Sequence, residues 1–514
     1  MLETSLHLYQ PAQYARSPEE WSTDFSKVIH KGEQKLSLDV SAILSILAFN
    51  YPCGDRTLFQ ELKRQPWLSS ITQDGRVVLK PIPPHGFAWD SSGKIAAQLN
   101  ILLQEEAERA CYNREEIYVL LSGGLDSRIV AGILYQLKQK GILKRNPIGL
   151  TWGLENSRDV QYAKVAAEML GFGWKHIAMG PETIIENIYE GFPLTAGLVP
   201  PAHLHRMLWF KKNVSKKALV LAGSYGDSVG RAEFSGRQIL ELDFLKPFDP
   251  YNLIKQDFLA PAISGIQKDL ILLHERAGQN SPKHALCEIE MQGHYMRGMI
   301  AHVMAVINNW CTLYQMFTDP KVYTYMWSLH PARRDDSIYA ALLESIHPGL
   351  VRIPWARTNK ALRGRTIGKQ NKLRRKFHDY AMWSSHSLYD EISKIVEPEW
   401  FESLGIFNPA QVQLLNKAVA SGGKLLKGYG FQLYNVWHWL AGFRKMIENL
   451  RSQGFAVHPV EQNLPITSAP PYLSQDRSFI YRKLSNIKLL YKIYSFYRKR
   501  STKYKAIKKW PINN

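Results

Sequence analysis

The sequence has few cysteines and no long apolar run. Its four cysteines, Cys53, Cys111, Cys287 and Cys311, are scattered without a CxxC pair or a zinc-ligand spacing, so neither a disulfide framework nor a zinc site is expected. No stretch of about 20 apolar residues occurs, which argues against a membrane-spanning helix. The first residues, MLETSLHLYQ, lack a basic segment followed by an apolar one, so no signal peptide is predicted. These absences favour a reduced, cytoplasmic protein.

Acidic residues are missing from the C-terminal end of the chain. Twelve Lys or Arg and no Asp or Glu fall between Arg477 and Asn514, which supplies more than half of the formal net charge of +20. On a helix, six side chains of this segment would share one face: Leu484, Ile487, Leu490, Tyr491, Tyr494 and Tyr497. A solvated tail and a peripheral contact with anionic lipid at the inner membrane surface both fit this pattern. Charge alone supports nucleic acid, which we do not favour as a partner.

The rest of the chain alternates between strand and helix patterns before it becomes mostly helical. Apolar runs predict strands at 117–121, 146–153, 174–179 and 216–223, and amphipathic segments predict helices at 128–141 and 159–171, the latter starting at Asp159. This alternation predicts a parallel α/β sheet. Helical patterns dominate from about 240 to 455.

Towards the N-terminus the pattern is less regular. Residues 38–50 have helical spacing, 51–66 (YPCGDRTLFQELKRQP) predict a loop followed by a short helix, and 94–112 predict a longer helix. We therefore divide the chain into an N-terminal region (1–93), a central domain (94–465) and a basic aromatic tail (466–514).

The stretch 117–130, IYVLLSGGLDSRIV, carries the strongest chemical signal. An apolar β-branched run stops at Ser122-Gly123-Gly124, and a helix follows Asp126. Paired glycines let backbone amides approach an anion, and the helix N-terminus adds partial positive charge. Because a carboxylate repels phosphate, Asp126 fits this turn when a magnesium ion lies between the two. The segment therefore predicts a cradle for pyrophosphate and magnesium.

A second acidic turn follows the strand that ends at Ala222. It reads AGSYGDSVGR, in which Gly223 and Gly226 bracket a tight turn and Asp227 ends it. In a parallel sheet this turn and the SGGLDS turn lie at the same edge, where the strands end. Asp227 fits a second magnesium contact or the other side of the same pyrophosphate, and the alternative is a helix-capping aspartate.

These blocks resemble those of a known enzyme family. SGGLDS resembles the PP-loop of the ATP pyrophosphatase superfamily, whose members cleave ATP to AMP and pyrophosphate. The order SGGLDSR, GLTWG, SRDVQYAKVAAEMLGFGWKH and AGSYGDS is similar to the synthetase half of asparagine synthetase and its relatives, which include β-lactam synthetase and lasso-peptide cyclases. Looser similarity is found in FNYPCGDRTLFQELKR, MFTDPKVYTYMWSLHP and IPWARTNK (353–360).

The resemblance implies a fold and a site. The fold is α/β, with a parallel sheet of the PP-loop (adenine nucleotide alpha hydrolase-like) type, a large helical second half and a small truncated N-terminal region. Nucleotide-binding residues would be Leu121, Ser122, Gly123, Gly124, Asp126, Ser127, Trp152, Gly223 and Ser224. Asp126 and Asp227 would hold Mg2+, and Lys360 or its rival Arg357 would stabilise the adenylation transition state. The implied reaction activates a carboxylate with ATP and lets an amine displace AMP to form an amide.

The sequence differs from the family's pattern at two places, and both differences limit which reaction the resemblance implies. The family's glutaminase begins with a nucleophilic Cys at position 2, but this chain has Leu2. Cys53 and Cys111 cannot replace an N-terminal thiol whose own amine acts as base, so glutamine hydrolysis by this chain is not expected. We therefore expect ammonia from a separate source or an amine carried by a substrate. In the second turn Ser224 stands where asparagine synthetases have a carboxylate, and Tyr225 follows. β-Lactam synthetase also has a tyrosine in that turn, so Tyr225 is a candidate catalytic residue.

Two functions remain open from the sequence. The first is an asparagine synthetase-like, ATP-dependent ligase that amidates a small-molecule, glycan or peptide carboxylate, in surface polysaccharide or natural-product biosynthesis. The second is a catalytically degenerate ATP-binding partner of a biosynthetic complex. The intact SGGLDS block and Asp227 favour the first function, and Ser224 favours the second.

Some other polar side chains are expected to have structural roles. His294 and His302, at helical spacing, are predicted to be packed or capping residues rather than ligands. Arg231 and Arg297 are predicted to be paired with acidic groups, with a substrate contact as the alternative.

We predict that removing the residues after about 470 lowers binding to anionic membranes, because the basic aromatic tail would supply the attraction. Cosedimentation of the full-length and truncated proteins with phosphatidylserine-containing vesicles measures this, with neutral vesicles as the control. Unchanged sedimentation of the truncated protein would rule out the lipid contact.

Overall fold

The computed structural model describes residues 8–459 except 18–19, 84, 87, 234–244, 279–280, 369–371, 424 and 426–430. Residues 1–462 group into one unit by their contacts. The predicted basic tail over 466–514 lies outside the described residues, and so does the lipid contact expected of it. Within the described residues, each helix is too short or too polar to cross a bilayer.

The central element is a five-stranded sheet in which every pairing is parallel. The strand order is β11-β10-β7-β8-β9. The strands are β7 (Ile117–Leu120), β8 (Ile148–Gly153), β9 (Gly173–Ala178), β10 (Leu219–Ala222) and β11 (Thr312–Gln315). The predicted parallel α/β sheet is confirmed. The fifth strand, β11, was not expected, because it is a four-residue segment within the half that has helical patterning.

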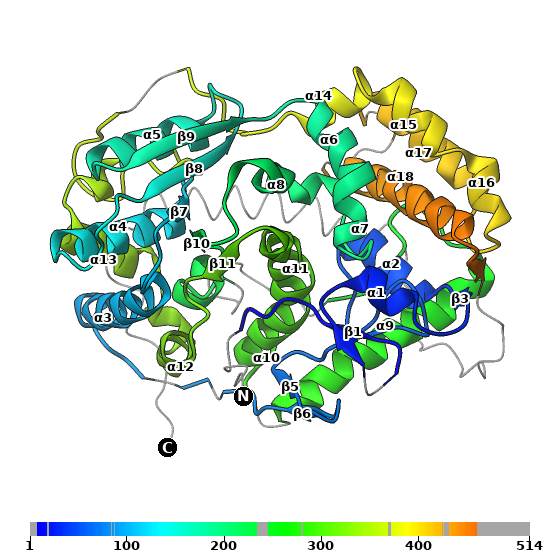
Figure 1. Cartoon of the computed structure of the whole chain (residues 1–514), viewed down its shortest axis with the longest axis horizontal. Helices are drawn as coiled ribbons and strands as arrows, with labels where there is room; N and C mark the ends of the chain where they lie inside the picture. Colours follow the sequence, from blue (N-terminus) through cyan, green and yellow to red (C-terminus); the bar gives the residue numbers. More distant parts are fainter. Residues whose placement is uncertain are drawn as a thin grey trace, which may run out of the picture. The chain divides into compact units, whose positions relative to one another are not determined.

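Helices cover the sheet as the alternating pattern predicts. α3 (Ser92–Cys111), α4 (Asp126–Gln139) and α13 (Asp336–Ile346) pack against one another, and α5 (Arg158–Met169) packs on β8 and β9 (Figure 1). The N-cap of α5 is Ser157, whose hydroxyl accepts the Val160 N–H at 3.3 Å. Asp159, expected to start this helix, lies in its first turn instead.

The second half is helical, as predicted. Its helices are α9 (Gln256–Ala277), α10 (Lys283–Glu290), α11 (His302–Met304), α12 (Pro320–Ser328), α14 (Tyr380–Ser385), α15 (Tyr389–Ile395), α16 (Pro398–Ser403), α17 (Pro409–Ala420) and α18 (Phe431–Ser452). A π-helical segment, η5 (Met291–Ala301), joins α10 to α11. Between β9 and β10 lie α6 (Glu182–Glu186), α7 (Phe192–Leu194) and α8 (Phe210–Asn213).

The N-terminal region shares a hydrophobic core with this helical half. It contains α1 (Phe25–Ile29), α2 (Val40–Phe49), β1 (Tyr14–Ala15), β2 (Trp21–Ser22), β3 (Lys35–Ser37), β4 (Lys63–Arg64), β5 (Ser69–Ile71) and β6 (Val77–Leu79). α2 packs against α9, and β3 pairs in parallel with β12 (Ala456–His458). One buried cluster joins side chains of 14–62 to side chains of 179–457. The boundary at residue 93 stays a prediction.

The short helix predicted within 51–66 is wrong. The Thr57 hydroxyl accepts the Phe59 N–H at 3.1 Å and donates to the Leu62 carbonyl at 3.1 Å, and the Arg64 N–H donates to the Asp55 carbonyl at 2.9 Å. These bonds compete with helical bonds and fold the segment into tight turns. Its end forms β4, which pairs antiparallel with β1.

We predict that Leu44→Ala destabilises the whole described unit. Leu44 is fully buried on α2, so truncation leaves a cavity in the core shared with α9, and the free energy of unfolding should fall by about 2–5 kcal/mol. Urea unfolding measures the change. Leu272→Ala is the matched control, because Leu272 is 52% exposed on α9. Equal losses for the two variants would contradict a shared core.

Candidate functional site

The PP-loop, SGGLDS at residues 122–127, leads from β7 into the start of α4 at the carboxyl edge of the sheet. Its two serines bond to each other, with 3.0 Å between the hydroxyl oxygens of Ser122 and Ser127, and the Ser122 hydroxyl accepts the Gly124 N–H at 3.1 Å. The N-cap of α4, Leu125, gives no side-chain cap. The first N–H groups of α4 therefore remain available for an anion, as the sequence predicts.

Hydrogen bonds hold the ends of the strands that border the loop. Leu121 is buried, and its N–H donates to the Leu150 carbonyl of β8 at 2.9 Å. The Leu121 carbonyl accepts the Thr151 hydroxyl at 2.8 Å. Trp152, at the end of β8, is half-buried and stacks on His205 with 6.1 Å between ring centroids. Both predicted border residues therefore lie at the ends of β7 and β8, next to the loop.

The second acidic turn lies beside the PP-loop because β10 and β7 are neighbours in the sheet. Asp227 is in a short π-helical turn, Gly226–Gly230. The approach to Asp126 is so close that a Cβ on Gly226 would lie 2.5 Å from Asp126 Oδ1, and one on Gly223 would lie 2.8 Å from the Asp126 carbonyl oxygen. Glycine is required at these two positions, and Ser224 lies half-buried between them.

The charges of Asp126 and Asp227 interact with the guanidinium of Arg231. Arg231 Nη2 lies 3.4 Å from Asp126 Oδ2, and its Nη1 lies 3.2 Å from Asp336 Oδ1. Burial and the charge of Asp126 raise the pKa of Asp227 to about 7, although Arg231 opposes the shift. The Arg231 guanidinium thus partly neutralises a carboxylate pair that is otherwise mutually repulsive.

The carboxylate pair fits a magnesium ion. The Oδ1 atoms of Asp126 and Asp227 are buried and accept no hydrogen bond from the described residues. Hard oxygen donors of this kind are the ligands that Mg2+ takes. The described residues hold no cluster of three or more metal-binding side chains, so phosphate oxygens and water would have to complete the coordination.

An aromatic and cationic wall faces the carboxylate pair. Arg231 lies between Tyr339 and Trp355, with its guanidinium carbon 5.4 Å from each ring centroid. Arg357 also lies near Trp355, with its guanidinium carbon 5.6 Å from the ring centroid, and its Nη1 is 3.4 Å from a carboxylate oxygen of Glu233. Neither Tyr339 nor Glu233 could be identified from the sequence, because neither lies in a block with a recognisable spacing.

Arg128 fixes the segment that carries this wall. It is fully buried in α4 and donates to the carbonyls of Leu350 (3.0 Å), Ile353 (2.9 Å) and Pro354 (3.0 Å) and to that of Gly123 (3.3 Å). Burial lowers its pKa to about 10. The residue that follows the SGGLDS block therefore ties the PP-loop to the IPWARTNK segment.

The rival residues Arg357 and Lys360 both lie in this segment and are exposed. The Trp355 N–H donates to the Lys360 carbonyl at 2.9 Å, which closes a turn over 355–360. Asn359 has a positive φ of 57° in this turn, and the Tyr162 hydroxyl donates to its side-chain oxygen. Arg357 is held by Glu233, whereas no ion pair within the described residues involves Lys360.

The side chain of Tyr225 is buried in the core. Its side chain is 1% exposed, and its hydroxyl donates to the Met296 carbonyl at 3.4 Å. Burial raises the pKa of the phenol far above its usual range. This placement gives Tyr225 a packing role and offers no support for the catalytic role expected from the sequence, which stays a prediction.

Four other residues have the structural roles predicted for them. His294 is buried and accepts the Gly54 N–H at 3.2 Å, and the buried His302 lies 2.8 Å from the Thr195 carbonyl oxygen. Arg297 pairs with Asp55 at 2.8 Å. Arg231 is paired too, but its partner Asp126 places it in the candidate site.

Comparison with known proteins supports the class that this site indicates. Residues 98–229 match the family model for asparagine synthase, and the match includes both acidic turns. No curated protein matches the chain. Among solved structures, NMN synthetase from Francisella tularensis is similar at 16% identity over 43% of this chain and 94% of that chain, with a TM-score of 0.20, which is too low to support an assignment. The match over residues 98–229 supports an ATP-dependent, amide-forming ligase in general.

We predict that Asp227→Asn stabilises the ligand-free protein at pH 8. Because the folded-state pKa of Asp227 is raised to about 7, its ionised form destabilises the fold above that pH, and the penalty fades as the pH falls from 7 towards 4. The gain at pH 8 should be on the order of 1–4 kcal/mol.

Urea unfolding at pH 8 and pH 5 tests this prediction, and the gain should be smaller at pH 5. Asp257→Asn is the matched control, because Asp257 is exposed in the first turn of α9. An equal effect of Asp227→Asn at both pH values would contradict the raised pKa.

Proposed function

We propose that this protein is an ATP-dependent ligase that activates a carboxylate as an acyl adenylate and transfers the acyl group to an amine. The observation that carries the proposal is the neighbouring pair Asp126 and Asp227, whose Oδ1 atoms have no hydrogen-bond partner among the described residues, beside the N-terminus of α4. A phosphate cradle and a magnesium-type carboxylate pair at one point suit the departure of pyrophosphate.

In this proposal the PP-loop binds the phosphates of ATP. The N–H groups at the start of α4 would face the β- and γ-phosphates, with Ser122 and Ser127 ordering the loop through their mutual hydrogen bond. Asp126 and Asp227 would hold Mg2+, which supplies positive charge to the leaving pyrophosphate. Leu121 and Trp152 would border the nucleotide from the strand ends.

The carboxylate substrate would approach the wall formed by Arg231, Trp355 and Arg357. Arg231 is already oriented by Asp126 and Asp336, so it is suited to hold charge in place rather than to move. Lys360 is the proposed stabiliser of the adenylation transition state, because it is exposed at the rim and has no ion pair within the described residues. Arg357 is engaged by Glu233, which favours a positioning role.

The amine would come from a substrate or from a separate ammonia source. Burial raises the pKa of the Cys53 and Cys111 thiols to about 12, and Cys287 and Cys311 are buried too, so none of them is suited to attack glutamine. Ser224 in the acidic turn is a poor base for an ammonium group. A small-molecule, glycan or peptide acid made in the cytoplasm, or at the inner membrane surface, would suit such a ligase.

Pyrophosphate exchange into ATP tests the adenylation step. With a panel of small, sugar and peptide acids, we expect acid-dependent exchange by the wild type and a loss of about 100-fold or more in Asp126→Ala, because a metal ligand at the leaving group is removed. Asp74→Ala, at an exposed β-turn carboxylate, is the control. ATP binding without exchange for any acid would instead support the catalytically degenerate partner protein that Ser224 suggests.

A comparison of Lys360→Ala with Arg357→Ala assigns the transition-state residue. We expect Lys360→Ala to lower kcat about 100-fold or more with little change in KM for ATP, because a charge used only in the transition state is lost. Arg357→Ala should mainly raise KM for the acid. The reverse pattern in steady-state kinetics would exchange the two roles.

A further inference from the structure

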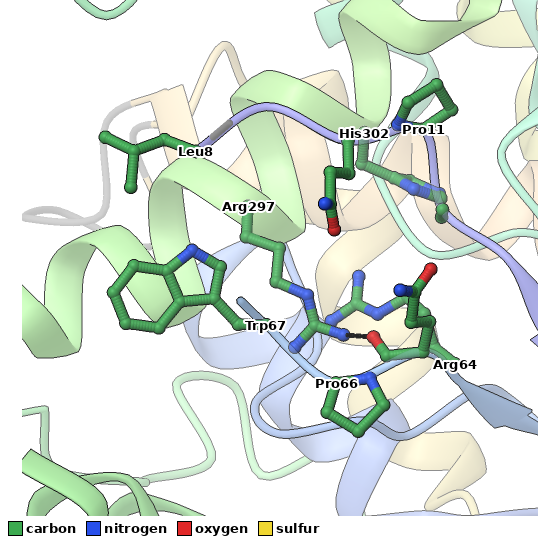
Figure 2. Close-up of a pocket in the computed structure, with 10 residues that line it drawn as sticks. Leu8, Pro11, Arg64, Pro66, Trp67, Arg297 and His302 are labelled. Atoms are coloured by element: carbon green, nitrogen blue, oxygen red, sulfur yellow. Dashed lines mark hydrogen bonds between the residues drawn. The ribbon is translucent and has the colours of Figure 1, made fainter. Parts of the chain in front are cut away.

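A cavity that contains two arginines lies apart from the two acidic turns. No residue of either turn lines it. It is lined by Leu8, by residues 10–12 and 64–67, and by Arg297 and His302, and its volume of about 20 Å3 leaves room for one small polar group (Figure 2). The described residues that line it include two arginines and no carboxylate. The cavity therefore has a strong positive charge for its size.

Arg64 is the feature of this cavity that ordinary packing does not explain. Its side chain is 1% exposed, and its Nη2 donates to the Gly54 carbonyl at 2.9 Å. Its Nε and Nη1 atoms are buried and have no acceptor among the described residues. Because Nε carries one hydrogen and Nη1 carries two, three N–H groups of one guanidinium lack a partner. Leaving such donors buried and unpaired is costly.

Arg297 increases the excess of positive charge around Arg64. Its Nη1 approaches the same Gly54 carbonyl at 3.3 Å, and its Nη2 donates to the Gln65 carbonyl, a bond that Figure 2 shows. Asp55 lies 2.8 Å from Arg297, but its side chain is 41% exposed. Burial and the charge of Arg297 lower the pKa of Arg64 to about 9, so Arg64 is still protonated at neutral pH. One carboxylate thus balances two guanidinium groups.

His302 adds a hydrogen-bond acceptor to the cavity. Its Nε2 lies 2.8 Å from the Thr195 carbonyl oxygen, so Nε2 carries the proton and Nδ1 is left with a free lone pair. Nδ1 is buried and has no donor among the described residues. Burial lowers the pKa of His302 to about 3, so the ring is neutral at physiological pH. The cavity can therefore accept a ligand hydrogen as well as donate to ligand oxygens.

We propose that this cavity is a binding site for a small oxyanion, a carboxylate or a phosphate group, whose oxygens accept the N–H groups of Arg64 Nε and Nη1. An O–H or N–H of the same ligand would reach His302 Nδ1. Trp67 and Pro66 add apolar surface to the lining, so the polar contacts of a ligand would come from the arginines and His302. This site does not depend on the proposed ligase activity.

The anion site and the acidic turn share the segment η5. Arg297, in η5, contributes to the cavity. Tyr295 lies two residues earlier, and its pKa is raised mainly by burial and further by the charges of Asp227 and Glu233. A ligand at Arg64 would therefore contact the same helical segment that borders the second acidic turn.

Thermal unfolding of the full chain tests the proposal. Wild type, Arg64→Met and the control Arg76→Met are titrated with inorganic phosphate or acetate against chloride of equal ionic strength. Arg76 suits the control because its side chain is 82% exposed. Phosphate that binds at α4 contributes equally to all three proteins, so the difference between wild type and Arg64→Met reports the cavity alone.

A saturable rise in the Tm of wild type and of Arg76→Met, with most of it lost in Arg64→Met, is the expected result. The anion that saturates at lower concentration identifies the group as phosphate or carboxylate. Equal shifts in wild type and Arg64→Met, or no shift in wild type with either anion, would overturn the proposal.

A second variant keeps the test decisive should Arg64→Met fail to fold. Arg64→Lys retains the charge but loses the planar fork. We expect it to weaken apparent anion affinity by about tenfold or more relative to wild type. Unchanged affinity in Arg64→Lys would overturn the assignment of Arg64 as the anion ligand.

Discussion

The buried guanidinium of Arg128 is the interaction on which the arrangement of the site depends. Among the described residues it pairs with no carboxylate; it donates to three carbonyls of the 350–354 segment and to the carbonyl of Gly123. A charged group is worth burying this way because charge-assisted hydrogen bonds are stronger than neutral ones and the fork matches several oxygens at once. Together with the Ala356 N–H, which donates to the Gly123 carbonyl at 3.0 Å, the Arg128 guanidinium holds the segment of Trp355, Arg357 and Lys360 against the PP-loop.

The second constraint is electrostatic and acts across neighbouring strands. Parallel pairing of β7 with β10 puts two carboxylates, Asp126 and Asp227, at one edge of the sheet, where they repel each other. Burial and this repulsion raise the pKa of Asp227, and Arg231 offsets part of the shift. A cation bound to both carboxylates would favour their ionised forms.

Much of the fold was predictable because its signals are local. The strands β7 to β10 and the helices α3, α4 and α5 appear close to where the apolar periodicity indicated, and both turns lie at the sheet edge that a parallel topology requires. The strand β11 was not predictable, because four residues are too few to show a period. The helix expected within 51–66 failed because the Thr57 hydroxyl bonds to backbone groups that a helix would have used.

The candidate site was predictable only where a motif carries it. The glycines and aspartates of the two turns have fixed spacings, so they could be named from the sequence. Tyr339 and Glu233 reach the site through tertiary packing that leaves no mark on their neighbours in the chain. The direction of the Tyr225 side chain was not predictable either, since a turn sequence does not tell which side faces the core.

The pairing of β3 with β12 has a consequence for synthesis of the chain. Residues 35–37 find their strand partner in residues 456–458, and α2 packs against α9, which is also made much later. A ribosome therefore releases the N-terminal region long before its partners exist, and its apolar faces stay uncovered through most of translation. The five-stranded sheet and the helices that pack on it, whose contacts are closer in sequence, can form meanwhile. The N-terminal region would therefore complete its packing last.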